Sequence, residues 1–346
     1  MIVIDFLKRS SKSCWYKFVV FTCLLIAGYG RAAAQQNIQF SQYIFNTLSV
    51  NPAYAGYKEE WFAQMALRNQ WIGIPGAPKT GQVSIDGILD PQTTKHGVGL
   101  QITSDQLGAQ SSNSITLDYA FRLQLDGADT KRLSFGLGLG VAQYSINGSA
   151  LTTVDGDDLA VPTGNTSSLV PDFRAGIYYT TPYWYIGLSA LNLLNNAHAI
   201  DDYRLNNSTY SDDIVQTRHV YFIAGGLINV SPDLRLRPSM MLREDFLGPT
   251  NADFNVMTIF SDRIWFGAGY RTSVKLFKKE YENTDVNSQA AIIGIAQFYV
   301  NERFRIGYSY DYAISKLQGY QTGTHELTVG IAFGKAPKAS ICPRVF

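Results

Sequence analysis

Apolar and polar residues alternate in about fourteen short segments between Trp61 and Gly334. In the clearest segment, residues 303–314, every even-numbered position is Phe, Ile or Tyr, and the odd-numbered positions are small, polar or charged. Successive side chains of a strand point to opposite faces, so the pattern predicts strands with one apolar and one polar face. The segments reach about ten residues, the length that a tilted strand needs to cross a bilayer, whereas a soluble sandwich needs only about five to eight.

The connections between these segments alternate in length. We expect strands near residues 60–69, 80–89, 96–104, 112–125, 132–146, 171–180, 183–193, 217–230, 233–244, 252–261, 263–272, 287–300, 303–314 and 324–334. Tight connections rich in turn residues fall at 90–91, 126–127, 181–182, 231–233, 261–262 and 301–302. Longer ones fall at 70–79, 147–170, 194–216, 273–286 and 315–323. Bacterial barrels have short periplasmic turns and longer external loops, so we predict a barrel with both ends of the mature chain in the periplasm.

Residues 1–34 have the pattern of a signal peptide. A positively charged start, with Lys8, Arg9, Lys12 and Lys17, precedes a short apolar run at 18–26. Small residues follow at 32–34, which predicts cleavage before Gln35. The alternative, a transmembrane anchor, needs a longer apolar run than this one.

The mature chain has little net charge and one cysteine. Removing residues 1–34 takes away five of the 29 basic and one of the 28 acidic residues, which leaves a net charge of about −3 and argues against a nucleic-acid partner. Cys342 then stands alone, so neither an internal disulfide nor a cysteine metal site is possible. No later segment is as long as a membrane-spanning helix, so crossing a membrane requires a closed barrel.

The alternation assigns the faces of each strand. Leu137 and Leu139 are predicted to face lipid, and Gly136, Gly138 and Gly140 to face the lumen. The same parity places a set of basic residues on the lumen side: Arg68, Arg122, Arg235, Arg237, Arg303 and Arg305. The lumen is therefore predicted to be wide, wet and basic. These arginines either pair with carboxylates, backbone carbonyls and a plug, or they line a path for anions or peptides.

Residues 35–59 precede the first strand and are rich in aromatic and amide side chains. They include the motif Asn51-Pro52-Ala53-Tyr54-Ala55-Gly56. Apolar groups at a chain start need burial, and the nearest site of burial is the lumen. We therefore predict a plug in the lumen, with Asn51, Pro52 and Ala53 near the periplasmic mouth or deeper. Pro52 fixes its own φ and disfavours helix at Asn51, so a bend is expected there.

No catalytic, metal or cofactor site is predicted. The Gly-x-Gly-x-Gly at 136–140 lies inside an alternating strand, which favours packing at the lumen wall over a nucleotide loop. The acidic run at 155–158 lacks the closing carboxylate of a calcium loop. The four histidines are scattered, and no serine–histidine–carboxylate motif stands out.

The C-terminal tail, residues 335–346, runs past the last predicted strand. It contains Lys338, Cys342, Pro343 and Arg344, and its prolines disfavour a further strand or helix. A leftover thiol in an oxidising compartment suggests pairing with another chain or a buried structural role. The tail is either a remnant or a contact site for periplasmic subunits.

Several motifs together resemble the PorP/SprF family of the type IX secretion system. They are Gln39-Phe40-Ser41-Gln42-Tyr43, Asn46, Asn51 to Gly56, Arg68-x-Gln70-Trp71, His325-Glu326-Leu327 and Cys342-Pro343-Arg344. The resemblance implies an outer-membrane barrel that works with the type IX apparatus of Bacteroidota, in secretion or gliding motility, and often with one large surface adhesin. It implies no catalytic residues. The Asn-Pro-Ala is also similar to the hatch of fatty-acid-channel barrels.

The sequence thus predicts an all-β, transmembrane outer-membrane barrel of about 14 antiparallel strands in a Gram-negative bacterium. Its parts are a signal peptide (1–34), a lumen plug (35–59), the barrel (60–334) and a periplasmic tail (335–346). The expected function is non-enzymatic: the protein helps to export or anchor a cell-surface adhesin and contacts outer-membrane lipid and periplasmic secretion subunits. The alternatives are a transporter for hydrophobic or anionic small molecules and an outer-membrane enzyme.

Overall fold

The computed structural model describes residues 38–151, 164–194, 198–199, 213–214, 217–246, 248–276 and 290–334. The predicted signal peptide and the tail, with Lys338, Cys342, Pro343 and Arg344, lie outside the described residues, as does much of three long connections. Residues 36–346 make one compact unit.

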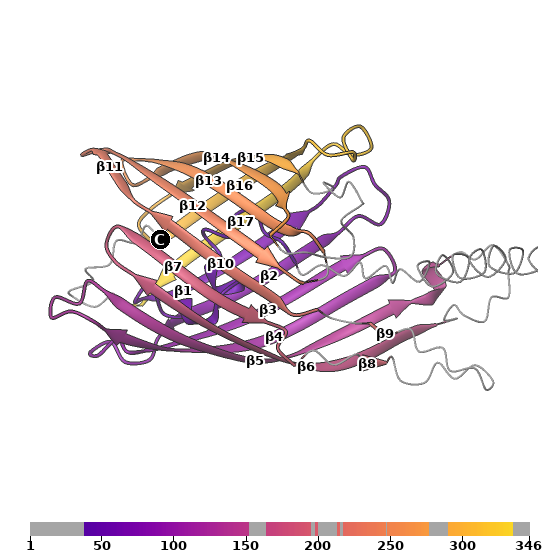
Figure 1. Cartoon of the computed structure of the whole chain (residues 1–346), viewed down its shortest axis with the longest axis horizontal. Helices are drawn as coiled ribbons and strands as arrows, with labels where there is room; N and C mark the ends of the chain where they lie inside the picture. Colours follow the sequence, from indigo (N-terminus) through magenta and orange to yellow (C-terminus); the bar gives the residue numbers. More distant parts are fainter. Residues whose placement is uncertain are drawn as a thin grey trace, which may run out of the picture. The chain divides into compact units, whose positions relative to one another are not determined.

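One antiparallel sheet makes up most of this unit (Figure 1). Its strands are β1 (Trp61–Asn69), β2 (Lys79–Ile88), β3 (His96–Leu107), β4 (Gln110–Gln124), β5 (Arg132–Asn147), β6 (Asn165–Thr180), β7 (Trp184–Leu191), β10 (His219–Gly226), β11 (Ile228–Ser231), β12 (Leu234–Glu244), β13 (Thr250–Phe260), β14 (Ile264–Val274), β15 (Ala291–Tyr299), β16 (Phe304–Ala313) and β17 (Thr324–Phe333). A separate pair is formed by β8 (His198–Ala199) and β9 (Asp213–Ile214).

The sheet closes on itself. Each strand pairs with its neighbour in sequence, and β1 pairs with β17 from Trp61↔Phe333 to Asn69↔His325. Strands β10 and β11 both pair with β12 in one continuous register, so they are two parts of one strand interrupted at Leu227. Within the described residues, the strands therefore form a closed antiparallel barrel of 14 strands, which confirms the predicted fold.

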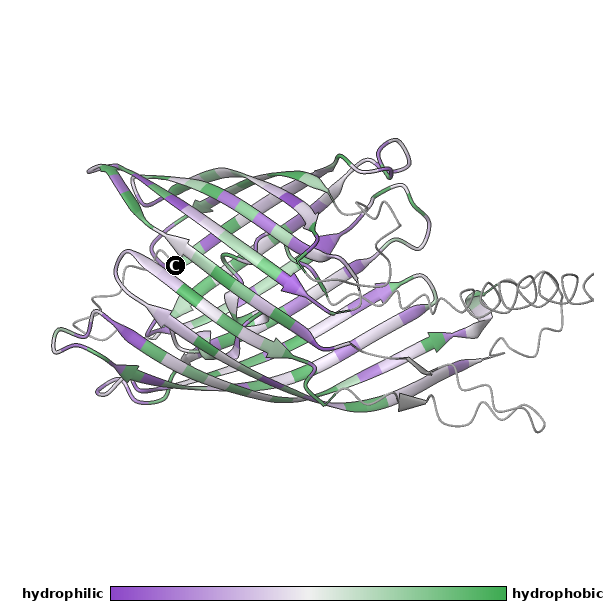
Figure 2. Ribbon diagram, in the orientation of Figure 1, coloured by the Kyte–Doolittle hydropathy of each residue, from purple (hydrophilic) through white to green (hydrophobic). Residues whose placement is uncertain are grey.

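The two faces of the barrel differ as predicted. Along the strands, hydrophobic and hydrophilic residues alternate (Figure 2). On β4 and β5, Leu117 and Leu139 are 61% and 63% exposed, whereas Asp118 is fully buried and Gly138 is buried. Soluble proteins bury leucine and expose charged side chains. Here the leucines face outward, where they contact lipid, and the charged side chains face inward.

Strand β6 begins six residues earlier than expected. It pairs with β5 along 16 residues, up to Asn147↔Asn165, whereas the sequence predicted a loop over 147–170. Residues 166–168 are all hydroxyl side chains, so their hydropathy does not alternate and gives no strand signal. Backbone pairing with β5 extends the strand without that signal.

The connections divide the barrel into two ends. The connections at 89–95, 125–131, 181–183, 232–233, 261–263 and 300–303 lie at one end, here called the short-turn end. The opposite, long-loop end carries the tight turn at 108–109 and the connections at 70–78, 148–164, 192–218, 245–249, 275–290 and 314–323. By the rule for bacterial barrels, we expect the short-turn end to face the periplasm and the long-loop end to face the cell exterior. No helix in the described residues has the length and apolar character to span a membrane.

Candidate functional site

Residues 38–60, the N-terminal segment, contact the inward-facing side chains of the strands. Its aromatic residues are buried: Phe40, Tyr43, Phe45, Tyr54 and Tyr57. All of these except Phe40 pack in one cluster with residues from β4, β6, β7, β10, β12, β13, β14 and β15. Burial raises the pKa of the Tyr43 phenol, whose oxygen accepts a hydrogen bond from Asn255 Nδ2 at 3.2 Å. The N-terminal segment and the barrel wall therefore form one hydrophobic core.

The Asn-Pro-Ala motif begins a short 3-10 helix, η2 (Pro52–Tyr54). Asn51 caps it: the side-chain oxygen accepts from the Ala53 backbone N–H at 2.9 Å, and the side-chain amide donates to the Ile177 carbonyl at 3.1 Å. Proline suits the first helical position because its missing N–H would have no helical partner there. The predicted bend therefore takes the form of a capped turn tied to β6.

Glycines of the barrel wall form a seat for this motif. A Cβ atom on Gly136 of β5 would overlap backbone atoms of Pro52 and Ala53, and one on Gly176 of β6 would overlap the Asn51 side chain. On β3, a Cβ at Gly97 would overlap the Ala55 carbonyl. Gly136 thus has the packing role predicted for it, because only glycine lets two backbones approach so closely.

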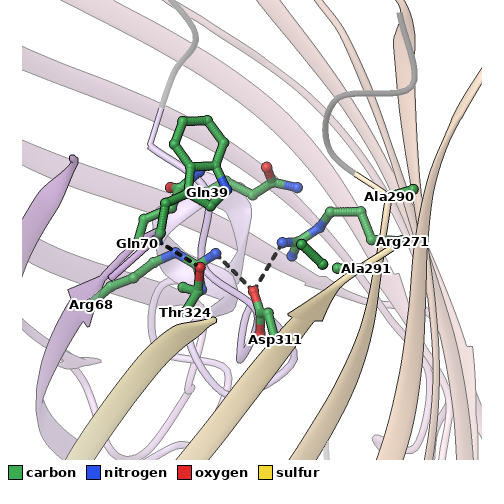
Figure 3. A pocket seen from close by; sticks show the side chains of 10 residues that line it. Gln39, Arg68, Gln70, Arg271, Ala290, Ala291, Asp311 and Thr324 are labelled. Atoms are coloured by element: carbon green, nitrogen blue, oxygen red, sulfur yellow. Dashed lines mark hydrogen bonds and ion pairs between the residues drawn. The ribbon is translucent and has the colours of Figure 1, made fainter. Parts of the chain in front are cut away.

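A buried ion cluster holds the start of the segment near the long-loop end. We call its members, Arg68, Arg271, Asp253, Asp311 and Glu326, the loop-end cluster. Arg68 lies 2.8 Å from Asp311 and 3.0 Å from Glu326, and Arg271 lies 3.2 Å from Asp311 and 2.6 Å from Asp253. Figure 3 shows the two arginines reaching Asp311 from different strands. All five side chains are buried, so each charge depends on these partners.

The N-terminal segment is part of this cluster. The Ser41 hydroxyl donates to Asp311 at 2.6 Å, and the backbone N–H groups of Ser41 and Gln42 donate to the two Glu326 oxygens at 2.8 and 3.0 Å. Two residues before Ser41, the Gln39 side-chain oxygen accepts from Arg243 at 3.1 Å. The first described residues thus lie toward the long-loop end, while the predicted ends of the mature chain lie outside the described residues.

A second cluster holds the other end of the segment at the short-turn end. Arg122 and Arg132 each lie 3.2 Å from the same Glu59 carboxylate oxygen. Both guanidinium groups also donate to the Thr94 carbonyl, at 3.1 and 3.0 Å, and Arg132 pairs with Asp129. Since Ser41 and Glu59 bind at opposite ends, the segment runs along the barrel axis.

Two further arginines contact the middle of the segment. Arg237 donates to the Ile44 carbonyl at 3.1 Å, and Arg305 donates to the Phe45 carbonyl at 3.0 Å. The Phe45 ring lies 5.6 and 5.3 Å from these two guanidinium groups, within the range of cation–π attraction. Arg305 also binds the side-chain oxygens of Gln64 and Gln297.

Much of the contact is made to the main chain of the segment. Wall side chains bond the backbone of Ser41, Gln42, Ile44, Phe45, Leu48, Val50, Gly56 and Tyr57. Carboxylates accept from N–H groups, and arginine, glutamine and serine donate to carbonyls. The wall therefore satisfies backbone groups that irregular chain would otherwise leave unpaired away from water.

The six arginines predicted to face the lumen occupy three kinds of location in the structure. Arg68, Arg122, Arg237 and Arg305 are buried inside the barrel and contact the segment or its ion clusters. Arg235 is partly buried and pairs with Asp262 at the short-turn end. The prediction is wrong for Arg303, which is exposed in a turn because β16 begins only at Phe304.

The lumen is also less basic than predicted. Buried carboxylates face the arginines, and Glu59 of the segment supplies one that strand parity could not reveal. Cavities beside the segment include one of about 20 Å³ and one of about 70 Å³. In the described part of the chain, no group of three or more His, Cys, Asp or Glu side chains has the arrangement of a metal site.

Comparisons with known proteins give one family match. The model of the family described as type IX secretion system membrane protein PorP/SprF matches residues 32–331. Among solved structures, the fold is similar to outer membrane protein Omp33 of Acinetobacter baumannii, with 6% identity, a TM-score of 0.46 and coverage of 80% of this chain and 98% of that chain. A FadL homologue of Pseudomonas aeruginosa gives 12% identity, a TM-score of 0.45 and coverage of 89% and 98%. No curated protein matches the sequence.

Proposed function

Because the chain belongs to the PorP/SprF family of type IX secretion system membrane proteins, we propose that it helps to export or anchor a partner protein at the cell surface and has no enzymatic activity of its own. The observation that carries the proposal is the family match over residues 32–331, which spans the N-terminal segment and nearly all of the barrel. The chain lies in the outer membrane, and the proposed partner is a surface adhesin, in secretion or gliding motility.

The N-terminal segment is proposed to close the lumen in the resting protein. In support, Ser41 and Glu59 are bound by buried ion clusters at the two ends of the barrel. The Asn51 turn between them is seated on wall glycines. A chain fixed at three points along the axis leaves little room for solute flow.

The contacts that hold the segment along the barrel axis favour this role over that of a transporter. A path for hydrophobic or anionic small molecules would have to be continuous between the two ends. Open conductance of the full chain would instead indicate a transporter.

The two ends of the barrel are proposed to meet different partners. The exported adhesin would be held at the long-loop end, outside the cell. Periplasmic secretion subunits would contact the short turns and the tail with Lys338, Cys342, Pro343 and Arg344. The tail stays a proposal, because it lies outside the described residues.

Conductance in planar bilayers tests the closure. The full mature chain should show no steady open channel, and a chain that lacks residues 38–57 should conduct. An open channel in the full chain would favour the transporter. Equal, low conductance of both chains would contradict closure by the segment.

Purification from the native membrane tests the partner proposal. A tagged full chain should co-purify a surface adhesin and periplasmic secretion subunits, and truncation after Gly334 should lose the periplasmic subunits while the barrel still inserts. Normal surface display of exported proteins in a strain without the gene would contradict the export role.

A further inference from the structure

The N-terminal segment is held in the lumen in the way that a bound peptide is held, and it is not part of the sheet. Its backbone–backbone hydrogen bonds are local, such as Phe45 N to Gln42 O and Tyr57 N to Tyr54 O, both at 2.9 Å. Within the part of the chain that the structure describes, none joins the segment to the backbone of a strand. Its hydrogen bonds to the wall are therefore made through side chains.

Wall side chains bind the main chain of the segment along most of its length. Those that bond its N–H or C=O groups include Glu326, Arg237, Arg305, Gln101, Ser189 and Asp86. Their partners extend from Ser41 near the long-loop end to Gly56 near the short-turn end. Main-chain groups are present in every polypeptide, so contacts of this kind do not depend on the sequence of the bound chain.

The wall also requires an occupant. Residues 38–57 contain no charged side chain. Arg305 is buried, and it bonds neutral acceptors: the Phe45 carbonyl and the side-chain oxygens of Gln64 and Gln297. Glu326 is buried as well, and it accepts two main-chain N–H groups of the segment. An empty lumen would leave such buried groups short of partners, so the wall favours a bound chain that supplies N–H and C=O groups.

We propose that the lumen is a binding site for an uncharged, irregular stretch of polypeptide, and that the N-terminal segment occupies it in place of a stretch of the exported partner. The identity of this occupant rests on the proposed export role. The wall sets two requirements for the stretch. An aromatic ring is favoured at the position of Phe45, 5.5 Å from the Trp265 ring and beside two guanidinium groups. A small residue is needed at the position of Ala53, against Gly136.

The attachment of the segment gives the exchange a direction. The segment continues into β1 after Glu60, at the short-turn end. Ser41 is bound at the opposite end, by the loop-end cluster. The segment can therefore be displaced from its Ser41 end while it stays joined to β1. The stretch of the partner would enter from the long-loop end, where the partner is proposed to be held.

Exchange of the segment in the full mature chain tests the proposal. A protease site is inserted between Glu60 and Trp61, and it is cleaved only after the barrel has folded in detergent, so folding does not depend on the cut. The released segment is washed away on an affinity resin. A fluorescent peptide of residues 38–60 should then bind with a Kd of about 1 µM or below, measured by anisotropy, whereas the uncut chain should exclude it.

Changes in the peptide separate main-chain from side-chain recognition. An amide-to-ester replacement at Gln42 or Gly56 removes the N–H that Glu326 or Asp86 accepts and leaves every side chain in place. Each should weaken binding by about tenfold or more. The same replacement at Gln39, whose side chain bonds the wall, is the control. A peptide that keeps Phe45 and residues 51–55, with other uncharged residues of similar size elsewhere, should bind within about tenfold of the native peptide.

A matched pair of wall variants checks the same site. Ser189→Ala removes the donor to the Val50 carbonyl and should weaken binding by about 2–10-fold. Ser309→Ala should have no effect, because that buried hydroxyl bonds no described residue.

The proposal is overturned if no peptide enters the cleaved barrel, or if the esters bind as tightly as the native peptide. It is also overturned if the peptide of changed sequence does not bind, because the lumen would then accept only its own segment. None of these measurements requires export. Peptide binding by the lumen would therefore stand even if a strain without the gene displayed its surface proteins normally and so contradicted the export role.

Discussion

Gly136 and Ala53 are in backbone contact, although they lie on β5 and in the N-terminal segment. A side chain at Gly136 would occupy the space of the Ala53 backbone nitrogen and Cα atom. Gly97 and Gly176 meet Ala55 and Asn51 in the same way. The seat of the Asn-Pro-Ala turn is therefore made by glycines of three strands, and it has no room for adjustment.

Gly136→Val should displace the N-terminal segment. The added atoms overlap backbone, which cannot rotate away, so the cost should exceed the ~1–3 kcal/mol of ordinary overpacking. Added protease should then cleave between residues 38 and 60, and conductance should rise. Gly294→Val is the control, since a Cβ atom there meets nothing within 4 Å. Equal protease resistance of the two variants would show that the seat does not hold the segment.

Glu326→Gln should destabilise the barrel strongly. Glu326 accepts from Arg68, Ser41 N and Gln42 N inside the loop-end cluster, and the loss of one partner of a buried ion pair costs about 3–5 kcal/mol. Unfolding from lipid vesicles by urea measures the change. Asp262→Asn is the matched control: it weakens the pair with Arg235, but the Asp262 side chain is 74% exposed, so the loss should stay within about 1 kcal/mol. Similar losses for both would argue against a buried network.

Glu59→Gln should loosen only the short-turn end of the segment. Arg122 and Arg132 would lose the carboxylate that they share, while Ser41 stays bound at the other end. Hydrogen exchange should increase around residues 56–60 and remain slow at 41–45. Glu302→Gln, in an exposed turn at the same end, serves as the control. Faster exchange along the whole segment would mean that the two ends are released together.

Leu139→Arg should impair insertion by about 2–4 kcal/mol, the cost of a basic side chain near the bilayer midplane. Leu139 is 63% exposed in the middle of β5. Leu151 is also exposed but lies beyond the end of β5, so Leu151→Arg should cost only about 0–1 kcal/mol. Folding yields in vesicles measure both. If the two changes are equally costly, the depth assigned to Leu139 is wrong.

The alternation of apolar and polar residues was enough to predict the strands, their faces and the barrel. Because side chains alternate with a period of two, exposed Leu139 next to buried Gly138 follows from order in the chain alone. Lipid requires a closed sheet, so closure also follows without knowledge of any contact. The first part of β6 was not predicted, because residues 166–168 all carry hydroxyl groups and their hydropathy does not alternate.

Only the tertiary structure decided what the inward-facing residues do. The alternation predicts that both Arg122 and Arg303 face the lumen. In the structure, Arg122 shares the Glu59 carboxylate with Arg132, whereas Arg303 lies in an exposed turn. The partners Glu59 and Arg122 are 63 residues apart, so no local pattern joins them. Likewise, the glycine at 136 is explained only by the close approach of Ala53. Periodicity fixes the direction of a side chain, whereas its partner depends on which distant segment the closed barrel brings against it.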